Sequence, residues 1–251
     1  KGISRKKELI SEIEKCGGEK VELLVNRKGE EIPISLEPVF TQEEEYKLGI
    51  WVRDNTQGIG TLTYIDQEGK FGALGHGISD TDTGELLDVS GGELYQAQII
   101  SIIQGTRGIP GELSGYIEYE EDKKIGTIEK NTDIGIFGEL FSGMEPSGKK
   151  VKIGYKQEVK KGKAQILIEL EGKPEYYDIE ITEIYGSRQD SNKSFQIQVT
   201  DPALLARTGG IVQGMSGSPI LQDGKLIGAV THVFVQDSSK GYGIFIENML
   251  G

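Results

Sequence analysis

The strongest chemical signal in the sequence is a serine between glycines. Ser216 lies in the segment Gln213-Gly214-Met215-Ser216-Gly217-Ser218-Pro219-Ile220. Glycines on both sides permit a tight turn that exposes the hydroxyl of a nucleophilic serine. Such a turn also aims backbone N–H groups at an oxygen that becomes negative during acyl transfer, and Gly214 and Ser216 are the expected donors. Taken alone, the segment is also compatible with a polar Gly-Ser turn between two strands.

The sequence has two histidines, so a general base of imidazole type is either His76 or His232. His76 directly follows a predicted hairpin of residues 60–65 and 70–74. His232 lies in a strand-like run soon after the serine, where a lone histidine is more often structural. We therefore predict His76 as the base. The order His76 then Ser216 is typical of trypsin-like enzymes, in which a first barrel supplies the histidine and a second barrel the serine.

The carboxylate that would complete a triad is less well defined by these residues. Asp133 begins a strand-like run between the histidine and the serine, much as the triad acid does in trypsin. Asp201 precedes Pro202, and this pair is equally the signature of a helix N-cap followed by proline at the first helical position. Asp80 and Asp82, close to His76 in the sequence, are further candidates.

Analogy with trypsin-like chains also predicts how substrate would bind. Thr231, His232 and Val233 would hold the substrate backbone as an added β-strand. At the position where enzymes that prefer basic side chains keep an aspartate, this chain has Gly210. A strict preference for Lys or Arg is therefore not predicted.

Short strands are the elements that must position these residues. The 251 residues include 36 glycines, which suits a turn-rich β fold. One later helix is expected over residues 202–207. The sequence predicts an all-β, trypsin-like double β-barrel peptidase domain over residues 48–251. Its expected strands are 61–65, 71–74, 96–103, 126–128, 134–137, 164–170, 177–181, 195–199, 219–221, 226–230 and 242–246.

Residues 1–40 are predicted to form a separate unit. Apolar residues recur at helical spacing between Arg5 and Cys16, and two strand-like runs, 20–26 and 31–36, follow. This helix–hairpin pattern resembles the second half of a PDZ domain. The resemblance implies the C-terminal part of a PDZ-like domain with an incomplete peptide groove, which could form a homodimer to cover its exposed edges. Residues 41–47 would be an acidic linker.

Composition disfavours several other functions. Asp plus Glu outnumber Lys plus Arg by 40 to 28, and the net charge of -12 disfavours nucleic acid as a partner. With Cys16 as the one cysteine and no metal or phosphate-loop motif, no metal and no cofactor are expected.

The sequence shows no targeting or transmembrane segment and begins at Lys1, so we interpret it as a processed or excised fragment. The lysine-rich stretch 149–163 could contact an anionic membrane surface, although the solvated side of a hairpin is the commoner explanation.

The two motifs taken together resemble one particular family. Leu74-Gly75-His76-Gly77-Ile78-Ser79-Asp80 and Ile211-Val212-Gln213-Gly214-Met215-Ser216-Gly217-Ser218-Pro219 are similar to the stage IV sporulation protein B family. That family combines a PDZ domain with a C-terminal serine peptidase, which is also the order predicted here. Its pattern places the triad acid in the Thr200-Asp201-Pro202 segment. The resemblance therefore implies the triad His76, Asp201 and Ser216.

The same resemblance implies a physiological role. It suggests a serine endopeptidase of sporulation that is secreted by the forespore into the space between two membranes. This protease would cleave itself and then a regulatory subunit of an intramembrane metalloprotease, which leads to activation of a sigma factor precursor. An inhibitor protein is a further implied partner. The alternative hypothesis is a catalytically latent protease-fold scaffold or binding module.

Overall fold

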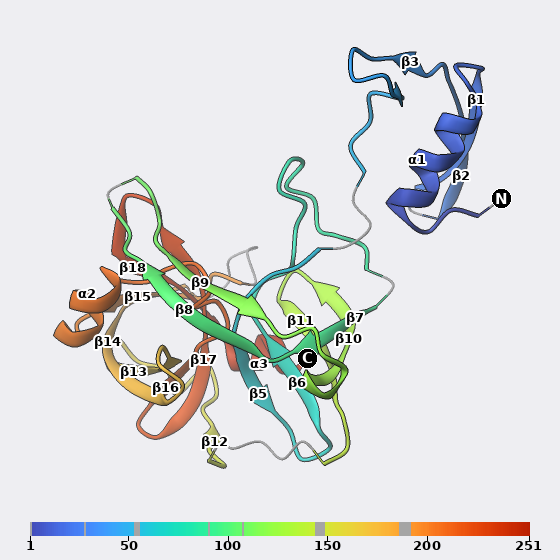
Figure 1. Ribbon diagram of the computed structural model, residues 1–251. Coiled ribbons are helices and arrows are strands. Elements are labelled where there is room, and N and C mark those ends of the chain that lie inside the picture. The colour runs from blue at the N-terminus through green and yellow to red at the C-terminus, as the bar shows by residue number, and fades with distance from the viewer. Residues whose placement is uncertain are drawn as a thin grey trace. The chain divides into compact units, whose positions relative to one another are not determined.

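The computed structural model describes residues 2–27, 29–52, 56–89, 91–106, 108–143, 149–185 and 192–251 (Figure 1). Two compact units make up the chain, Lys1–Gly58 and Ile59–Gly251. No helix in the described ranges is long and apolar enough to cross a membrane.

The first unit consists of one helix and two hairpins. Helix α1 (Lys6–Lys15) buries Ile13, and the chain leaves it through Gly17 and Gly18, whose φ angles of 57° and 89° favour glycine. Strands β1 (Val21–Arg27) and β2 (Glu30–Leu36) pair antiparallel in continuous register. The predicted helix and hairpin are thus present. The short strands β3 (Val39–Phe40) and β4 (Tyr46–Lys47) pair across the segment predicted as a linker, while the PDZ-like assignment stays a prediction.

The second unit begins with a five-stranded antiparallel sheet. Its order is β5 (Leu62–Ile65), β6 (Lys70–Ala73), β11 (Gly135–Leu140), β10 (Lys124–Thr132) and β7 (Gly92–Tyr95). Phe71, Ala73 and Ile136 are buried on one face and form its core. A separate hairpin consists of β8 (Ala97–Ile103) and β9 (Glu112–Ile117), and a 3-10 turn, η1 (Glu121–Lys123), leads into β10.

The rest of this unit is a closed six-stranded barrel. In ring order its strands are β17 (Lys225–Phe234), β16 (Pro219–Gln222), β13 (Gly162–Glu169), β14 (Pro174–Ile184), β15 (Phe195–Val199) and β18 (Asp237–Phe245), and β18 pairs with β17 to close the ring. Alternate residues of these strands point inward, as in β15, where Phe195, Ile197 and Val199 are buried. Strand β12 (Lys152–Ile153) extends the sheet beside the start of β17.

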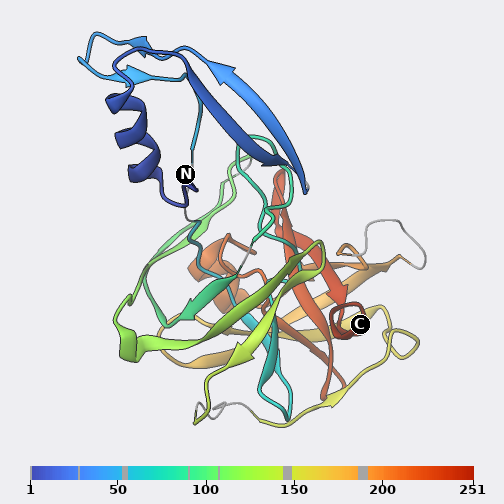
Figure 2. The same ribbon diagram turned by 90° about the vertical axis from the view of Figure 1, so that its right-hand side faces the viewer.

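Two short helices complete the fold, α2 (Pro202–Thr208) and α3 (Ile246–Leu250). The view in Figure 2 shows the second unit turned by 90°. The all-β class predicted from the sequence is confirmed, and the second unit contains a closed six-stranded barrel. Strands β7, β9 and β12 and helix α3 were not predicted.

Candidate active site

Ser216 lies at the tip of a sharp turn between α2 and β16. Met215 is fully buried, its N–H donates to the Val212 carbonyl at 3.2 Å, and its carbonyl accepts from the Ser218 N–H at 3.0 Å. Gly214 and Gly217 have φ angles of 97° and 91°, a region that favours glycine. A Cβ on Gly217 would lie 2.1 Å from the Thr61 carbonyl oxygen, so the turn also requires glycine sterically. The predicted turn with glycines on both sides of the serine is therefore present, and its backbone conformation requires those glycines.

Two backbone amides beside the Ser216 hydroxyl are available for a ligand. Within the described part of the chain, the N–H groups of Gly214 and Ser216 donate to no protein acceptor. Their neighbours differ, because Gly217 donates to the Val230 carbonyl at 2.8 Å and Met215 and Ser218 donate within the turn. Donors without a protein acceptor at these two positions are what an oxyanion hole requires.

The His76 loop is formed by two consecutive residues in the left-handed region. Leu74 and Gly75 have φ angles of 66° and 70°, and they reverse the chain at the end of β6. A Cβ on Gly75 would lie 2.9 Å from the Thr231 side chain, so this loop packs directly against β17. The half-buried His76 ring has its Nδ1 2.8 Å from the Gly77 carbonyl oxygen. Because a carbonyl oxygen can only accept, Nδ1 carries the proton and Nε2 is the basic nitrogen of the neutral ring.

Backbone and threonine hydrogen bonds join the histidine hairpin to the serine turn. The Thr61 N–H donates to the Ser216 carbonyl at 3.0 Å, and the Thr61 carbonyl accepts from the Leu74 N–H at 3.2 Å. The buried Thr63 hydroxyl donates to the Gly217 carbonyl at 2.8 Å. Sequence reasoning missed both threonines. Their alternate spacing on the strand that enters the hairpin was the available signal.

Strand β17 brings the serine and both histidines together. The Ser216 hydroxyl donates to the Thr231 carbonyl at 3.0 Å. The ring centroids of His76 and His232 are 5.1 Å apart. The structure thus brings His76, Ser216, Thr231 and His232 to one place. In this structure the Ser216 hydroxyl is bonded to a main-chain carbonyl.

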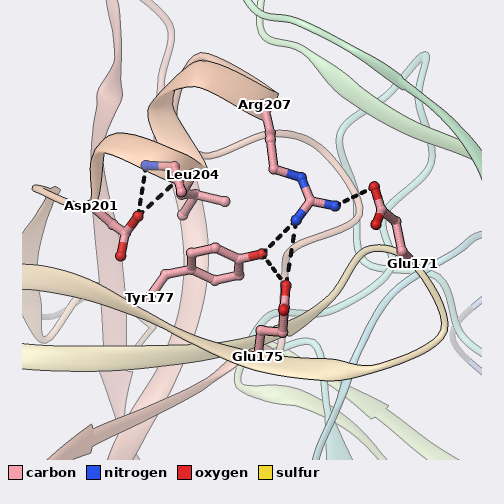
Figure 3. Close-up of polar contacts among 7 residues, drawn as sticks. Glu171, Glu175, Tyr177, Asp201, Leu204 and Arg207 are labelled. Atoms are coloured by element: carbon pink, nitrogen blue, oxygen red, sulfur yellow. Dashed lines mark hydrogen bonds and ion pairs between the residues drawn. The ribbon is translucent and has the colours of Figure 1, made fainter.

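Asp201 is not part of this cluster. One carboxylate oxygen accepts from the N–H groups of Ala203 and Leu204 at 2.8 and 3.1 Å, and the other accepts from the Asp178 N–H at 3.2 Å. These are the contacts of a helix N-cap (Figure 3). Asp178 belongs to β14, which lies directly across the ring from β17. The predicted pairing of Asp201 with His76 is therefore absent from this structure, because the carboxylate caps α2 instead.

Asp133 lies beside the histidine loop with an exposed side chain. It occupies the turn between β10 and β11, and its carbonyl accepts from Asn192 at 3.0 Å. The preceding residues hold the loop, since the Asn131 amide accepts from the Ile78 N–H and donates to the Ile78 carbonyl, each at 2.8 Å. Sequence reasoning missed Asn131.

The carboxylate of Asp80, a further candidate acid, stabilises a local turn. It accepts from the N–H groups of Asp82 and Thr83 at 2.9 and 3.0 Å. Asp82, the last candidate, has an exposed side chain in the same turn. In the described residues no group of three or more His, Cys, Asp or Glu could hold a metal ion.

The predicted substrate strand has one edge beside the serine. Residues His232 and Val233 pair with Tyr242 and Gly241 of β18. On the opposite edge, the pairing with β16 ends at Ala229. Beyond that point the Thr231 carbonyl faces Ser216. The main-chain bonds on this side run on to Val230, which accepts from the Gly217 N–H and donates to the Ser218 carbonyl.

Gly210 is required by packing. Its φ angle is 130°, and a Cβ would lie 2.2 Å from the Ser238 carbonyl oxygen. No side chain fits there, which gives a steric reason for the lack of an aspartate at this position.

The comparisons with solved structures find distant likenesses to proteases. The Rv3671c protease in its inactive form is 14% identical with a TM-score of 0.37, over 64% of this chain and 86% of that one. The active form of the same protease, from M. tuberculosis, is 17% identical with a TM-score of 0.37, over 59% and 69%. The HtrA-type protease AlgW with a decapeptide is 11% identical with a TM-score of 0.40, over 88% and 52%.

The family comparison covers most of the chain. No curated protein matches the sequence. The model of the SpoIVB peptidase S55 family matches residues 44–250, a segment that contains both the His76 loop and the Ser216 turn. The chain therefore belongs to the SpoIVB peptidase S55 family and is a serine endopeptidase.

Proposed function

We propose that Ser216 is the nucleophile and His76 the general base of this peptidase. The observation that carries the proposal is the hydrogen-bond network that fixes both loops, in which Thr61 bonds to the Ser216 carbonyl on one side and to the Leu74 N–H on the other. The tautomer of His76 agrees with this role, because the proton on Nδ1 leaves Nε2 free to accept.

The reaction would proceed by acyl transfer. A substrate strand would pair with residues 231–233, and the Ser216 hydroxyl would exchange the Thr231 carbonyl for His76 Nε2. As the hydroxyl oxygen attacks the peptide carbonyl, its proton passes to Nε2, and the N–H groups of Gly214 and Ser216 stabilise the oxyanion. His76 then protonates the leaving amine. Finally it takes a proton from the water that attacks the acyl-enzyme, and it returns this proton to the Ser216 oxygen as the acyl group leaves.

Family membership supports a role in sporulation signalling. In this proposal the protease cleaves itself and then a regulatory subunit of an intramembrane metalloprotease, so that a sigma factor precursor is activated. The site of action would be the space between the two forespore membranes. An inhibitor protein, peripheral membrane contact and a homodimer through residues 1–40 are further proposals.

A latent enzyme is the second candidate, and one observation favours it. The Ser216 hydroxyl donates to a main-chain carbonyl, which lowers its availability to the base. A partner or substrate that displaces this bond would activate the enzyme. Weak reactivity that increases on addition of substrate peptide would support this candidate.

Covalent labelling tests the nucleophile. A fluorophosphonate probe should label the wild-type chain and Ser101→Ala, a control in which an exposed serine of β8 is replaced. It should not label Ser216→Ala, and His76→Ala should react far more slowly. Equal labelling of the wild type and Ser216→Ala would overturn the assignment.

A further inference from the structure

We propose that the side chain of Ile211 closes the pocket for the substrate residue on the acyl side of the cleaved bond, so that the peptidase takes a small apolar residue there. This substrate residue is called P1, and its carbonyl carbon is the atom that Ser216 attacks. The inference rests on the proposed function and deepens it, because it names the class of substrate that the site accepts. It follows from where P1 must lie, from what fills that space and from the charges around it.

Two contacts of the proposed reaction define where the P1 side chain lies. The P1 carbonyl oxygen faces the N–H groups of Gly214 and Ser216, which donate to no protein acceptor in the described chain. The P1 backbone lies along residues 231–233 of β17. A side chain attached between these points enters the space between the segment before the serine and β17. In trypsin-like enzymes the shape of this pocket sets the preference for P1.

The side chain of Ile211 reaches across this space to β18. Ile211 is 2% exposed, and a Cβ on Gly241 would lie 2.7 Å from its Cδ1 atom. Gly241 is the register partner of Val233 in β17. The end of the Ile211 side chain therefore lies against β18, directly beside the strand that the substrate would follow.

Backbone contacts with β18 close the pocket beyond Ile211. The Ser238 carbonyl oxygen accepts from the Ile211 N–H at 2.7 Å, and a Cβ on Gly210 would lie 2.2 Å from the same oxygen. The Ser238 hydroxyl donates to the Gly209 carbonyl at 2.8 Å. Residues 209–211 and β18 are thus in direct contact. A long P1 side chain cannot pass between two segments that are joined in this way.

The surroundings of the pocket also disfavour a charged P1 residue. Ile211 and Val233 pack in one apolar cluster. The two charged residues of β18, Asp237 and Lys240, form an ion pair with each other at 3.0 Å. This strand therefore offers no unpaired counter-ion, and burial of an unpaired charge is costly. We expect alanine or valine at P1, and neither phenylalanine nor lysine.

Covalent probes that differ only at P1 test this inference. Peptidyl diphenyl phosphonates need no known cleavage sequence, because the nucleophilic serine oxygen displaces a phenoxide from phosphorus. The alanine and valine probes should label the wild-type chain about 10²-fold faster than the phenylalanine and lysine probes. In Ile211→Ala the phenylalanine probe should gain about tenfold or more relative to the alanine probe, because the shortened side chain opens the pocket.

Ile227→Ala is the matched control. Ile227 is also 2% exposed and lies in β17, but its Cγ2 atom lies 2.7 Å from the position of a Cβ on Gly154. Both variants shorten a buried isoleucine and lower stability. Because each result is a ratio of two probes on one protein sample, the fraction of folded protein cancels. The control should keep the wild-type ratio.

Three outcomes would overturn the inference. Equal labelling rates with all the probes would show that wild type has no closed pocket. An unchanged ratio in Ile211→Ala would show that this side chain does not close it, and an equal change in Ile227→Ala would show a general loosening of the barrel. Fluorophosphonate labelling separates these results from failure of the proposed function. That failure would appear as equal labelling of wild type and Ser216→Ala.

Discussion

The Ser216 turn and the Asp201 segment both present side-chain oxygens that sequence reasoning assigned to one triad, yet their hydrogen bonding differs. The serine turn leaves the Gly214 and Ser216 amides without protein acceptors in the described structure, and its hydroxyl makes a single bond to a carbonyl. The Asp201 carboxylate binds three backbone N–H groups. Hydrogen-bonding capacity is therefore available at the serine turn, whereas that of the Asp201 carboxylate is used by the backbone.

The largest effect expected from this comparison is on the serine turn. In Gly214→Ala, a Cβ would lie 3.0 Å from Leu113 Cβ, and the φ of 97° is unfavourable for alanine. The displaced amide should lower kcat by about 10²-fold. Steady-state kinetics with a peptide substrate would measure this loss.

Gly224→Ala is the matched control for that experiment. Gly224 also has a positive φ, 74°, but nothing lies within 4 Å of its Cβ position. It should lower the free energy of unfolding by about 1 kcal/mol and leave kcat unchanged. Equal losses of kcat in the two variants would show that general strain, and not the position of the amide, explains the effect.

A smaller effect is expected at the junction between the two loops. Thr63→Val keeps the side-chain shape but removes the hydroxyl that donates to the Gly217 carbonyl. Because a buried acceptor is left unsatisfied, the free energy of unfolding should fall by about 1–3 kcal/mol. Urea denaturation would measure it. Thr56→Val, at an exposed position of the first unit, should change stability by less than about 0.5 kcal/mol; a comparable loss there would contradict the argument.

The sequence predicted the elements whose local pattern is strong. The alternating runs of β13 to β18 correspond to the observed barrel, and Asp201-Pro202 predicted the N-cap of α2. The contacts that unite the site were not predictable in the same way. Several hydrogen bonds of the site join residues that are far apart in the chain. They are the bonds of Thr61, Thr63 and Asn131 and the bond that the Thr231 carbonyl accepts from Ser216. Each of these bonds involves a backbone group, and every residue has backbone groups. Composition and spacing therefore cannot predict which residues form these bonds.

The most direct test of the central claim is a double-mutant cycle of kcat/KM for Ser216→Ala, His76→Ala and the double variant. If the imidazole acts by activating this hydroxyl, each single change should remove nearly all activity, of the order of 10⁶-fold in a comparable system, and the double variant should be no worse than either. Losses that add in free energy would contradict the claim, because the two residues would then act independently.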